Sequence, residues 1–433
     1  MGSSNDMPAP HPTRHWLPAA AAVAVAAWGA NQFTALATVY RARTDWSALS
    51  LAAMFSVYLL GLVPGLLLGG PAADRYGRRQ TVRGALGLSA AASVLLALGD
   101  EPSVYAARLG TGFAAGLVFL AGTTWLRELS GPEVPPEDGA RRAMYATGTG
   151  FAAGALVSGV IAEWLPGPMA LPGLAHALGC LLVLRATRRL PETAPGRCAP
   201  QHHTAAVRHP RFRYVVLPAS PAVLGAATVA YVVLPPLVAD RVPGYAPLFS
   251  GLVAALTLTA GVVAQPFAAR LDDADSARAT LTAMATVIAG LLLGALAAAH
   301  DSVGLVVAAA VVLGTGYGLT LGAGLHEVER LTPGRTARPG GPTSASLYQS
   351  TTSSGFLTPL LLAGTSGHAS YPALLAGMAA VGLLCLAVTA AHSRRHLPGP
   401  EHRHPAPAGR GKSEDASVQS GPTPPRSRRR WAE

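Results

Sequence analysis

The sequence predicts an all-α integral membrane protein with twelve transmembrane helices in two pseudo-symmetric six-helix bundles. Hydrophobic residues make up 50% of the 433 residues and charged residues only 13%, whereas soluble domains average about 25% charged residues. Apolar runs long enough to cross a bilayer, which takes about 20 residues, recur along the chain. Six of these runs precede a long polar segment and six follow it, which predicts two related bundles.

The first six spans are separated by short polar or charged turns. The first run follows a polar tail and continues for about 23 residues, longer than the core of a secretory signal peptide and long enough to span. Glycines at spacing four in the second run (Gly61, Gly65 and Gly69) predict close approach by another helix. The predicted spans lie near Leu17–Val39, Ala48–Gly70, Val82–Leu98, Val104–Leu126, Ala143–Leu165 and Met169–Leu184.

The second half repeats this plan after a polar segment that holds seven arginines. The eleventh predicted span, counted from the start of the chain, is rich in Ser, Thr and Gln in its first part. A polar helix at membrane depth should face protein or a water-filled cavity. The predicted spans lie near Tyr214–Val238, Leu248–Ala268, Ala279–Ala299, Val303–Leu325, Ser344–Ala363 and Tyr371–Ala391.

These boundaries divide the chain into five parts. A cytoplasmic tail (1–16) is followed by the N-terminal bundle (17–185), a cytoplasmic linker (186–213), the C-terminal bundle (214–391) and a basic tail (392–433). The last part is rich in Pro, Ser, Gly and Arg, a composition typical of disorder.

The distribution of arginine and lysine predicts the orientation in the membrane. If the N-terminus is cytoplasmic, the inside segments hold 29 of the 33 basic residues, and the outside loops hold Arg41, Arg43 and Arg241. Cytoplasmic loops normally carry this excess, so we expect both termini in the cytoplasm. Abundant Ala and Gly with the single lysine Lys412 indicate a GC-rich bacterium, and therefore its cytoplasmic membrane.

Neither the cysteines nor the basic residues indicate another kind of site. Cys180 and Cys385 lie in apolar runs and Cys198 in a polar loop, as expected of small buried hydrophobic residues and one exposed thiol rather than of a disulfide framework or a metal site. The basic residues recur from loop to loop instead of gathering on one domain with aromatic residues, which excludes nucleic acid as the expected partner.

A compact charged turn, Gly70–Arg79 (GPAADRYGRR), joins the second and third predicted spans. Its glycines permit a tight turn, Asp74 can accept hydrogen bonds from a helix N-terminus, and its arginines can pair with acids or lipid head groups. From the residues alone, it is also a positively charged topology anchor.

The decapeptide resembles the loop between the second and third helices of major facilitator superfamily transporters. The run Arg189–Thr193 also resembles the segment after the sixth helix in many members. The resemblance implies that the loop latches the cytoplasmic ends of the two halves in the outward-open state, with Asp74 facing the start of the eleventh helix. It assigns gating to Gly70, Asp74, Arg75, Gly77, Arg78 and Arg79, with Glu128 as the partner acid of the fourth helix.

Three residues are candidates for proton coupling. Arg108, followed by glycines at spacing four, resembles the family's fourth-helix signature, whose arginine is associated with proton transfer. It also lies only about 6 Å from Val104 along a helix, so that it could instead extend to the membrane surface. No acid falls at the middle of a span, which leaves Glu163 and His176 as the titrating candidates. For both residues, a side chain that reaches the membrane surface or is satisfied inside the protein is the simpler interpretation.

The fifth span carries glycines that match the signature of drug:proton antiporters only in part. The expected Gly-Pro pair is Gly154-Ala155 in this chain, and close packing of small residues explains the glycines without implying export.

Neutral aromatic and amide side chains inside the spans form a candidate substrate cavity. Groups of this kind suit a bulky, weakly polar solute better than a phosphate or a dicarboxylate, although any one of them could be a helix-packing residue. The candidates are Trp28, Asn31, Gln32, Thr34, Tyr58, Tyr231, Tyr317, Thr320, Tyr348 and Gln349.

The resemblance therefore implies a secondary active transporter that works by alternating access, most simply a monomer that exports drug-like or secondary-metabolite solutes in exchange for protons. Its partners would be a small solute, protons and membrane lipid, with no cofactor. The alternatives are an importer of a small neutral metabolite and, from another class, a membrane-embedded enzyme or receptor. The last is disfavoured because His, Asp, Glu and Ser do not cluster at membrane depth and the tail is too biased to fold.

Overall fold

The computed structural model describes residues 15–131, 134–193, 209–273, 275–331, 344–395 and 397. Most of the predicted tail 1–16, the middle of the linker with Cys198, and most of the tail 392–433 lie outside them. The helices of the first half are α1 (Trp16–Arg43), α2 (Ala48–Tyr76), α3 (Arg78–Leu96), α4 (Glu101–Leu117), α5 (Thr123–Leu129), α6 (Pro136–Trp164) and α7 (Leu171–Thr187), with the π-helical turn η1 (Val118–Gly122) between α4 and α5.

The second half has the same plan. Its helices are α9 (Leu217–Thr228), α10 (Leu234–Leu237), α11 (Ala246–Leu271), α12 (Arg278–His300), α13 (Val303–Arg330), α14 (Ser344–Ser353), α15 (Thr358–Thr365) and α16 (Tyr371–His392). The shorter elements are η2 (Phe212–Val216), η3 (Val229–Val233), η4 (Ala239–Arg241) and η5 (Ser354–Leu357).

Several of these helices continue one another through a short element. When α4–η1–α5, η2–α9–η3–α10 and α14–η5–α15 are each joined, the described residues form twelve helical segments. Nine helices of the described chain are long and apolar enough to cross a membrane by length and composition. The all-helical, multi-span fold class predicted from the apolar runs is confirmed.

Prolines explain two of the interruptions. Pro218 lies two residues after the end of η2, and Pro235 lies two residues after the end of η3. Because proline has no N–H, the ordinary four-residue hydrogen-bond pattern is broken at these positions. The N–H groups of Leu217 and Leu234 instead donate to carbonyls five residues back, at Phe212 and Val229, which is the pattern of a π-helical turn.

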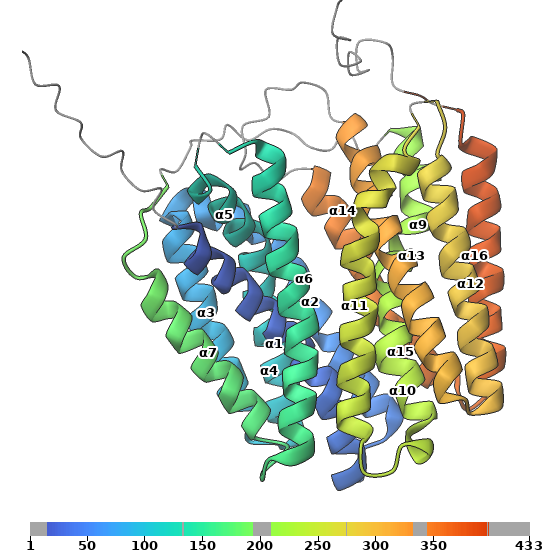
Figure 1. The fold of residues 1–433 in the computed structure, drawn as a ribbon, viewed down its shortest axis with the longest axis horizontal. Helices are drawn as coiled ribbons and strands as arrows, with labels where there is room; N and C mark the ends of the chain where they lie inside the picture. Colours follow the sequence, from blue (N-terminus) through green and yellow to red (C-terminus); the bar gives the residue numbers. More distant parts are fainter. Residues whose placement is uncertain are drawn as a thin grey trace, which may run out of the picture.

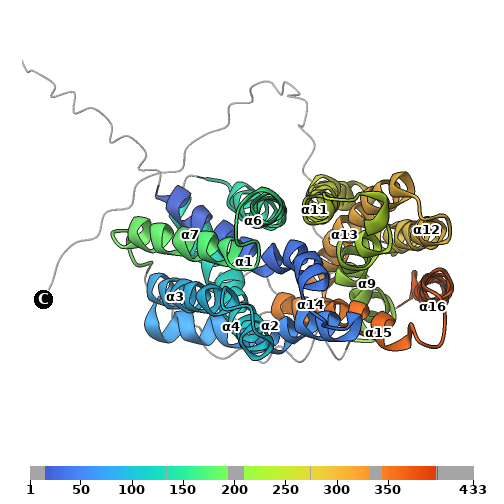
Figure 2. The same cartoon turned by 90° about the horizontal axis from the view of Figure 1, so that it is seen from below.

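The helices form two bundles that lie side by side (Figure 1). One bundle contains α1 to α7 and the other α9 to α16. Seen along the helices, α6 of the first bundle faces α11 of the second, and α2 lies beside α14 and α15 at the centre (Figure 2). The start of α1, the turn at Gly77 and the end of α16 share one edge, called here the Gly77 side. The opposite edge is called the Glu163 side.

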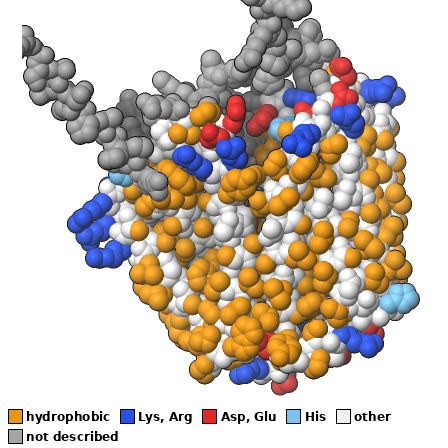
Figure 3. Space-filling view, in the orientation of Figure 1, with side chains coloured by type: hydrophobic (Ala, Val, Ile, Leu, Met, Phe, Trp, Pro, Cys, Tyr) orange, Lys and Arg blue, Asp and Glu red, His pale blue; other side chains and the backbone are white. Residues whose placement is uncertain are grey.

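Apolar side chains cover the flank of the molecule that faces the viewer, and charged side chains gather at its two edges (Figure 3). On α16, Val381, Leu383 and Leu384 are more than half exposed. Large apolar surfaces of this extent on helices of spanning length are stable only against lipid. The chain is therefore a multi-pass membrane protein.

Close packing within the first bundle follows the glycines of α2. A Cβ atom on Gly61 would lie 2.1 Å from the carbonyl oxygen of Leu109, and one on Gly65 would lie 2.4 Å from that of Phe113. Only glycine allows the backbones of α2 and α4 to approach this closely. The close approach expected from the glycine spacing is confirmed, and it fixes the position of α4 and its Arg108.

Candidate transport site and its gates

The turn between α2 and α3 consists of a single residue. The sequence predicts a compact turn over Gly70–Arg79, whereas α2 continues to Tyr76 and α3 begins at Arg78. Gly77 between them has φ 88° and donates its N–H to the carbonyl of Ala73 at 3.0 Å. A positive φ favours glycine because a Cβ atom would collide with the neighbouring backbone.

A carboxylate from the segment after α7 holds this turn. Glu192 Oε1 accepts the backbone N–H of Arg79 at 3.0 Å, which places a negative charge at the N-terminus of α3, where it is stabilised. A Cβ atom on Gly77 would lie 2.6 Å from Glu192 Cδ, so glycine is required here for space as well. Arg79 Nη1 also donates to the carbonyl of Leu190 at 2.9 Å. From the sequence, the run Arg189–Thr193 was recognised only by its family resemblance, and its contact with the turn at Gly77 was not predicted.

Arg78 joins the turn to the end of the fourth segment. Its Nη2 lies 2.8 Å from Glu128 Oε1, and its side chain is only 4% exposed. Asp74, one helical turn earlier, also interacts electrostatically with Arg78, but its Oδ1 has no hydrogen-bond partner in the described part of the chain. The side chains at the start of α14, which the family resemblance places opposite Asp74, lie outside the described residues.

The two remaining residues of the predicted gate are Gly70 and Arg75, both in α2. Gly70 is buried in α2. Arg75 is exposed at its end, with the guanidinium 5.4 Å from the centre of the Tyr76 ring.

The two bundles contact each other through hydrogen bonds in the half of the molecule nearer the Glu163 side. Ser56 Oγ donates to the carbonyl of Phe356 at 3.0 Å, and Ser250 Oγ to that of Thr34 at 3.3 Å. At the rim, the N–H of Leu248, in the first turn of α11, donates to Glu163 Oε2 at 3.4 Å. The acid proposed from the sequence as a titrating group therefore caps a helix of the opposite bundle.

On the Gly77 side, the ion pairs of the described residues stay inside one bundle. Arg78 pairs with Glu128 in the first bundle, and Arg211 and Arg330 pair with acids of the second. Cross-bundle contacts thus close the Glu163 side of the molecule in this conformation.

Arg108 lies buried in the first bundle near this closed half. Its side chain is 1% exposed. Nη1 donates to the carbonyl of Ala30 at 3.2 Å, and Nε and Nη2 donate to those of Met54 and Phe55 at 3.4 Å. No carboxylate of the described residues forms an ion pair with it. The guanidinium does not extend to the membrane surface, which was one of the two expectations for this residue.

Aromatic rings surround the same guanidinium. Its central carbon lies 4.7 Å from the ring centre of Tyr58, 4.9 Å from that of Phe33 and 5.6 Å from that of Phe55. The negative face of an aromatic ring attracts a cation, and more strongly where water is excluded. Carbonyl oxygens and ring faces therefore hold a full positive charge without an acidic neighbour.

The rings continue into the second bundle. Phe356 lies 5.6 Å from Phe55 and 5.3 Å from Tyr58, and Tyr231 lies 6.4 Å from Phe55, measured between ring centres. Phe33, Phe55, Tyr58, Tyr231 and Phe356 are all buried, and we call this set the aromatic seam. The three phenylalanines were not among the predicted lining residues, because a phenylalanine in an apolar run carries no signal beyond that of a core residue.

A second polar cluster lies inside the first bundle. Gln32 Nε2 donates to Ser93 Oγ at 3.1 Å, and Ser93 Oγ lies 2.7 Å from His176 Nδ1. His176 Nε2 lies 2.9 Å from the carbonyl of Val25, which can only accept, so Nε2 carries a hydrogen and donates it. The His176 side chain is fully buried. Trp28, which donates to Ser158 Oγ at 3.2 Å, packs edge-on against it.

The other predicted lining residues are dispersed. Asn31 is buried in α1, and Tyr317 of α13 packs beside Gly261 of α11. The hydroxyl of Tyr348 donates to the carbonyl of Thr320 at 3.0 Å inside the second bundle, while Gln349 is exposed.

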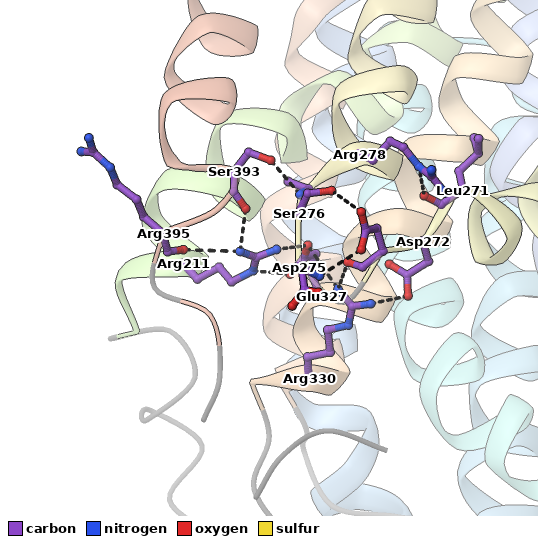
Figure 4. A network of polar contacts seen from close by, with 12 residues as sticks. Arg211, Leu271, Asp272, Asp275, Ser276, Arg278, Glu327, Arg330, Ser393 and Arg395 are labelled. Atoms are coloured by element: carbon purple, nitrogen blue, oxygen red, sulfur yellow. Dashed lines mark hydrogen bonds and ion pairs between the residues drawn. The ribbon is translucent and has the colours of Figure 1, made fainter. Parts of the chain in front are cut away.

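The second bundle has its own charged cluster on the Gly77 side (Figure 4). Arg211 and Glu327 form two hydrogen bonds of 2.7 Å, and their side chains are 0% and 2% exposed. Arg330 pairs with Asp272 in the turn between α11 and α12. In the same turn, the backbone amide of Asp275, together with the hydroxyl of Ser276, lowers the pKa of Asp273 below its ordinary value.

The two bundles hold their equivalent turns in the same way. In the first bundle, Glu192, just past the sixth segment, accepts from the N-terminus of α3. In the second, Ser393 Oγ, just past the twelfth segment, accepts the N–H of Ala277 before α12 at 2.8 Å. The pseudo-symmetry predicted from the repeated plan of spans thus extends to these contacts. Metal binding has no candidate among the described residues, since no three His, Cys, Asp or Glu side chains form a group that could hold an ion.

Comparisons with known proteins agree with this arrangement. A family model described as the Major Facilitator Superfamily matches residues 19–341. A 3-(3-hydroxy-phenyl)propionate transporter of Escherichia coli strain K12 is 40% identical over 80 residues, which are 18% of this chain and 20% of that protein. The match thus spans about a fifth of that relative's length.

Solved structures share the fold across most of the chain. The crystal structure of a mutant of the nucleoside transporter NupG has a TM-score of 0.69 at 13% identity and covers 87% of this chain and 98% of its own. That of a D-xylose-proton symporter has a TM-score of 0.63 at 16% identity, covering 90% and 98%.

Proposed function

The chain belongs to the major facilitator superfamily, and we propose that it carries an aromatic carboxylate across the bacterial cytoplasmic membrane by alternating access. The family is one of transporters, so the protein is a secondary transporter and not an enzyme. The proposal concerns the solute and the orientation of the chain in the membrane. It takes the protein as a monomer with both termini, and hence the Gly77 side, in the cytoplasm.

The buried charge of Arg108 is the observation that carries the proposal. An arginine within a span costs about 2.5–3.5 kcal/mol on insertion scales and is normally paired with another charged group or with backbone carbonyls. Arg108 makes three hydrogen bonds to carbonyls, and a guanidinium has five N–H groups. Two N–H groups therefore remain, and a carboxylate can accept paired hydrogen bonds from a guanidinium fork. A solute that brings its own carboxylate would supply the counter-charge.

The aromatic seam supports an aromatic solute. Its five rings lie at the junction of the two bundles, where midplane sites of such transporters form, and aromatic rings pair favourably with one another by edge or offset contacts. The name of the matching relative, a 3-(3-hydroxy-phenyl)propionate transporter, describes a hydroxylated benzene ring with a short side chain that ends in a carboxylate. That substrate belongs to the relative, and it supports this class for the present chain.

This proposal changes the expectation of a neutral cavity. The residues selected from the sequence carry no fixed charge, and they favoured a weakly polar solute. Contact between Arg108 and Tyr58 adds a positive charge to that lining, which favours an anion. Proton-coupled export of an uncharged drug-like solute is the second candidate, favoured by the uncharged rings of the aromatic seam, and it would not require Arg108 to bind the solute.

The gates supply the alternating access. In this conformation the Glu163 side is closed by Glu163, Ser250 and the aromatic seam. The opposite state requires these contacts to part and the Gly77 side to close, which the family resemblance assigns to Asp74 and its neighbours. Protons remain the proposed coupling ion, with Arg108, Glu163 and His176 as the candidates stated from the sequence. Solute flux into vesicles of known orientation under an imposed pH gradient distinguishes export from import.

Ligand-induced stabilisation tests the solute class. Purified protein is heated with 3-phenylpropionate, with its neutral amide 3-phenylpropanamide, or without ligand. A ligand at 100 times its Kd stabilises the folded state by about 2.7 kcal/mol, so we expect the acid to raise Tm and the amide to leave it unchanged. The rise should disappear in Arg108→Gln and persist in Arg241→Gln, which removes an exposed arginine of the Glu163 side. Equal shifts with the acid and the amide would favour the neutral, drug-like candidate.

A further inference from the structure

The outer surface of the second bundle carries a groove that the transport site does not use. It lies between α16 and the start of the seventh segment, with a volume of about 320 Å³. The groove is lined by Arg213, Leu217, Pro218, Leu384, Cys385 and Val388. We propose that this groove binds one anionic phospholipid, with the head group at Arg213 and an acyl chain along the apolar walls.

The position of the groove matches the depth of a lipid. Arg213 is the second residue of η2, and Val388 lies four residues before the end of α16. Both are therefore within about one helical turn of the membrane edge on the Gly77 side. Leu217 and Leu384 lie about 6 Å deeper at 1.5 Å per residue, and both are exposed on the surface that faces lipid. The charged end of the groove is thus at head-group level and its apolar end in the hydrocarbon.

Local structure explains why a groove forms here. The π-helical turn η2 and Pro218 interrupt the regular surface of the seventh segment, and proline projects no long side chain toward α16. At the rim, the rings of Tyr214 and His392 stack with their centres 4.3 Å apart and 9° between their planes. The stack joins the two helices at the rim of the groove. The groove is therefore bounded at its end on the Gly77 side, and it is open to lipid along the outer surface of the bundle.

The charge at the rim selects an anion. Arg213 is exposed, and none of the ion pairs in the described chain involves it. Arg394 and Arg395 follow α16 and are also exposed, and the Arg395 side chain points away from the neighbouring charged cluster (Figure 4). Acids neutralise Arg211 and Arg330 next to them. Basic sites between transmembrane helices at the cytoplasmic face typically bind anionic head groups, and a phosphate accepts paired hydrogen bonds from arginine.

Native mass spectrometry of the full chain tests the site. The protein is released from detergent after equilibration with phosphatidylglycerol or with phosphatidylcholine, and bound lipids are counted. We expect one phosphatidylglycerol to be retained at activation energies that remove phosphatidylcholine. Its occupancy should fall about tenfold, which corresponds to about 1.4 kcal/mol, in Arg213→Gln and in Cys385→Trp, which fills the groove.

The control is Arg278→Gln, which removes an exposed arginine on the same side of the same bundle and should retain the lipid. Inorganic phosphate added in excess should not displace the lipid, because the acyl chain contributes to binding. Equal retention of the two lipids, or equal loss of phosphatidylglycerol in all three variants, would overturn the proposal and leave only the bulk lipid layer. Thermal unfolding of each variant without added lipid shows that it remains folded.

Discussion

Gly77 is the residue at which geometry constrains the sequence most tightly. Its φ of 88° and the carboxylate of Glu192, which a Cβ atom would meet at 2.6 Å, both exclude a side chain. Glycine is therefore required here for two independent reasons. It adopts the backbone conformation that joins α2 to α3, and it leaves room for the carboxylate that caps α3.

Replacing Gly77 by alanine should lower the stability of the fold. The backbone of Gly77, with φ 88° and ψ 154°, lies in a region that only glycine adopts readily and that costs other residues about 1–3 kcal/mol, and displacement of Glu192 removes the cap of α3 as well. Thermal unfolding of the purified variant should show a lower Tm. Gly87→Ala is the matched control, because Gly87 lies in α3 with no atom within 4 Å of its added Cβ and helix propensity favours alanine. A Tm of Gly77→Ala equal to that of Gly87→Ala would refute the constraint.

Asp74 is the residue on which the proposed cytoplasmic latch depends. Its carboxylate lies beside the Arg78–Glu128 pair with one oxygen unpartnered among the described residues. Asp74→Asn keeps the shape and removes the charge, so transport should fall while expression and membrane insertion stay normal. Transport by membrane vesicles, normalised to protein inserted, measures this. Undiminished flux in the variant would exclude the gating role.

At the scale of elements, the contact of α6 with α11 closes the Glu163 side. Glu163 accepts from Leu248 in the first turn of α11, and a carboxylate at a helix N-terminus contributes about 0.3–1 kcal/mol. That contribution exists only while the two bundles are in contact at this edge, so the cap biases the molecule toward the conformation seen here.

Glu163→Gln should weaken this closure without unfolding either bundle. A cysteine placed at Thr34, whose carbonyl accepts from Ser250 across the junction, reports the opening through its reaction with a membrane-impermeant thiol reagent. We expect labelling to rise up to about fivefold, the equivalent of 1 kcal/mol. Glu101→Gln, an exposed acid at the same edge, should leave labelling unchanged. Unaltered labelling in Glu163→Gln would show that the cap does not bias the gate.

The pair formed by Arg211 and Glu327 ties the seventh segment to α13. Both side chains are almost completely buried, and removing one partner of a buried pair costs about 3–5 kcal/mol because the other charge is left uncompensated. Glu327→Gln should therefore lower Tm far more than Asp272→Asn, whose pair with Arg330 is about a quarter exposed. Similar Tm values for the two variants would contradict the importance of the buried pair.

The sequence predicted the whole molecule better than its parts. Apolar runs determine the spans because only a helix satisfies its own backbone in lipid, and the two-bundle plan followed from counting them. The extension of α2 to Tyr76 was missed, since the charged residues after Gly70 mark where the membrane ends and not where the helix ends. The surroundings of Arg108 could not be predicted either, because they depend on carbonyls and rings brought together from several helices.

The candidate site shows the same limit. Tyr58 and Tyr231 were selected from the sequence and lie in the aromatic seam. Gln32 and His176 instead hydrogen-bond to Ser93 inside the first bundle, and Trp28 packs against His176 there. Side-chain type identified polar and aromatic positions within the spans. It did not tell which helix face each one occupies, and this is set by packing between helices.

Across the whole molecule, the account rests on transport of an aromatic carboxylate that Arg108 recognises. Counterflow into proteoliposomes measures it directly: vesicles loaded with unlabelled 3-phenylpropionate at neutral pH are diluted into the labelled acid. Transient accumulation of label is expected with the unaltered chain and with Arg241→Gln. A loss of about tenfold or more, equivalent to at least about 1.4 kcal/mol, is expected with Arg108→Gln. Counterflow by Arg108→Gln at the rate of the unaltered chain would contradict the account.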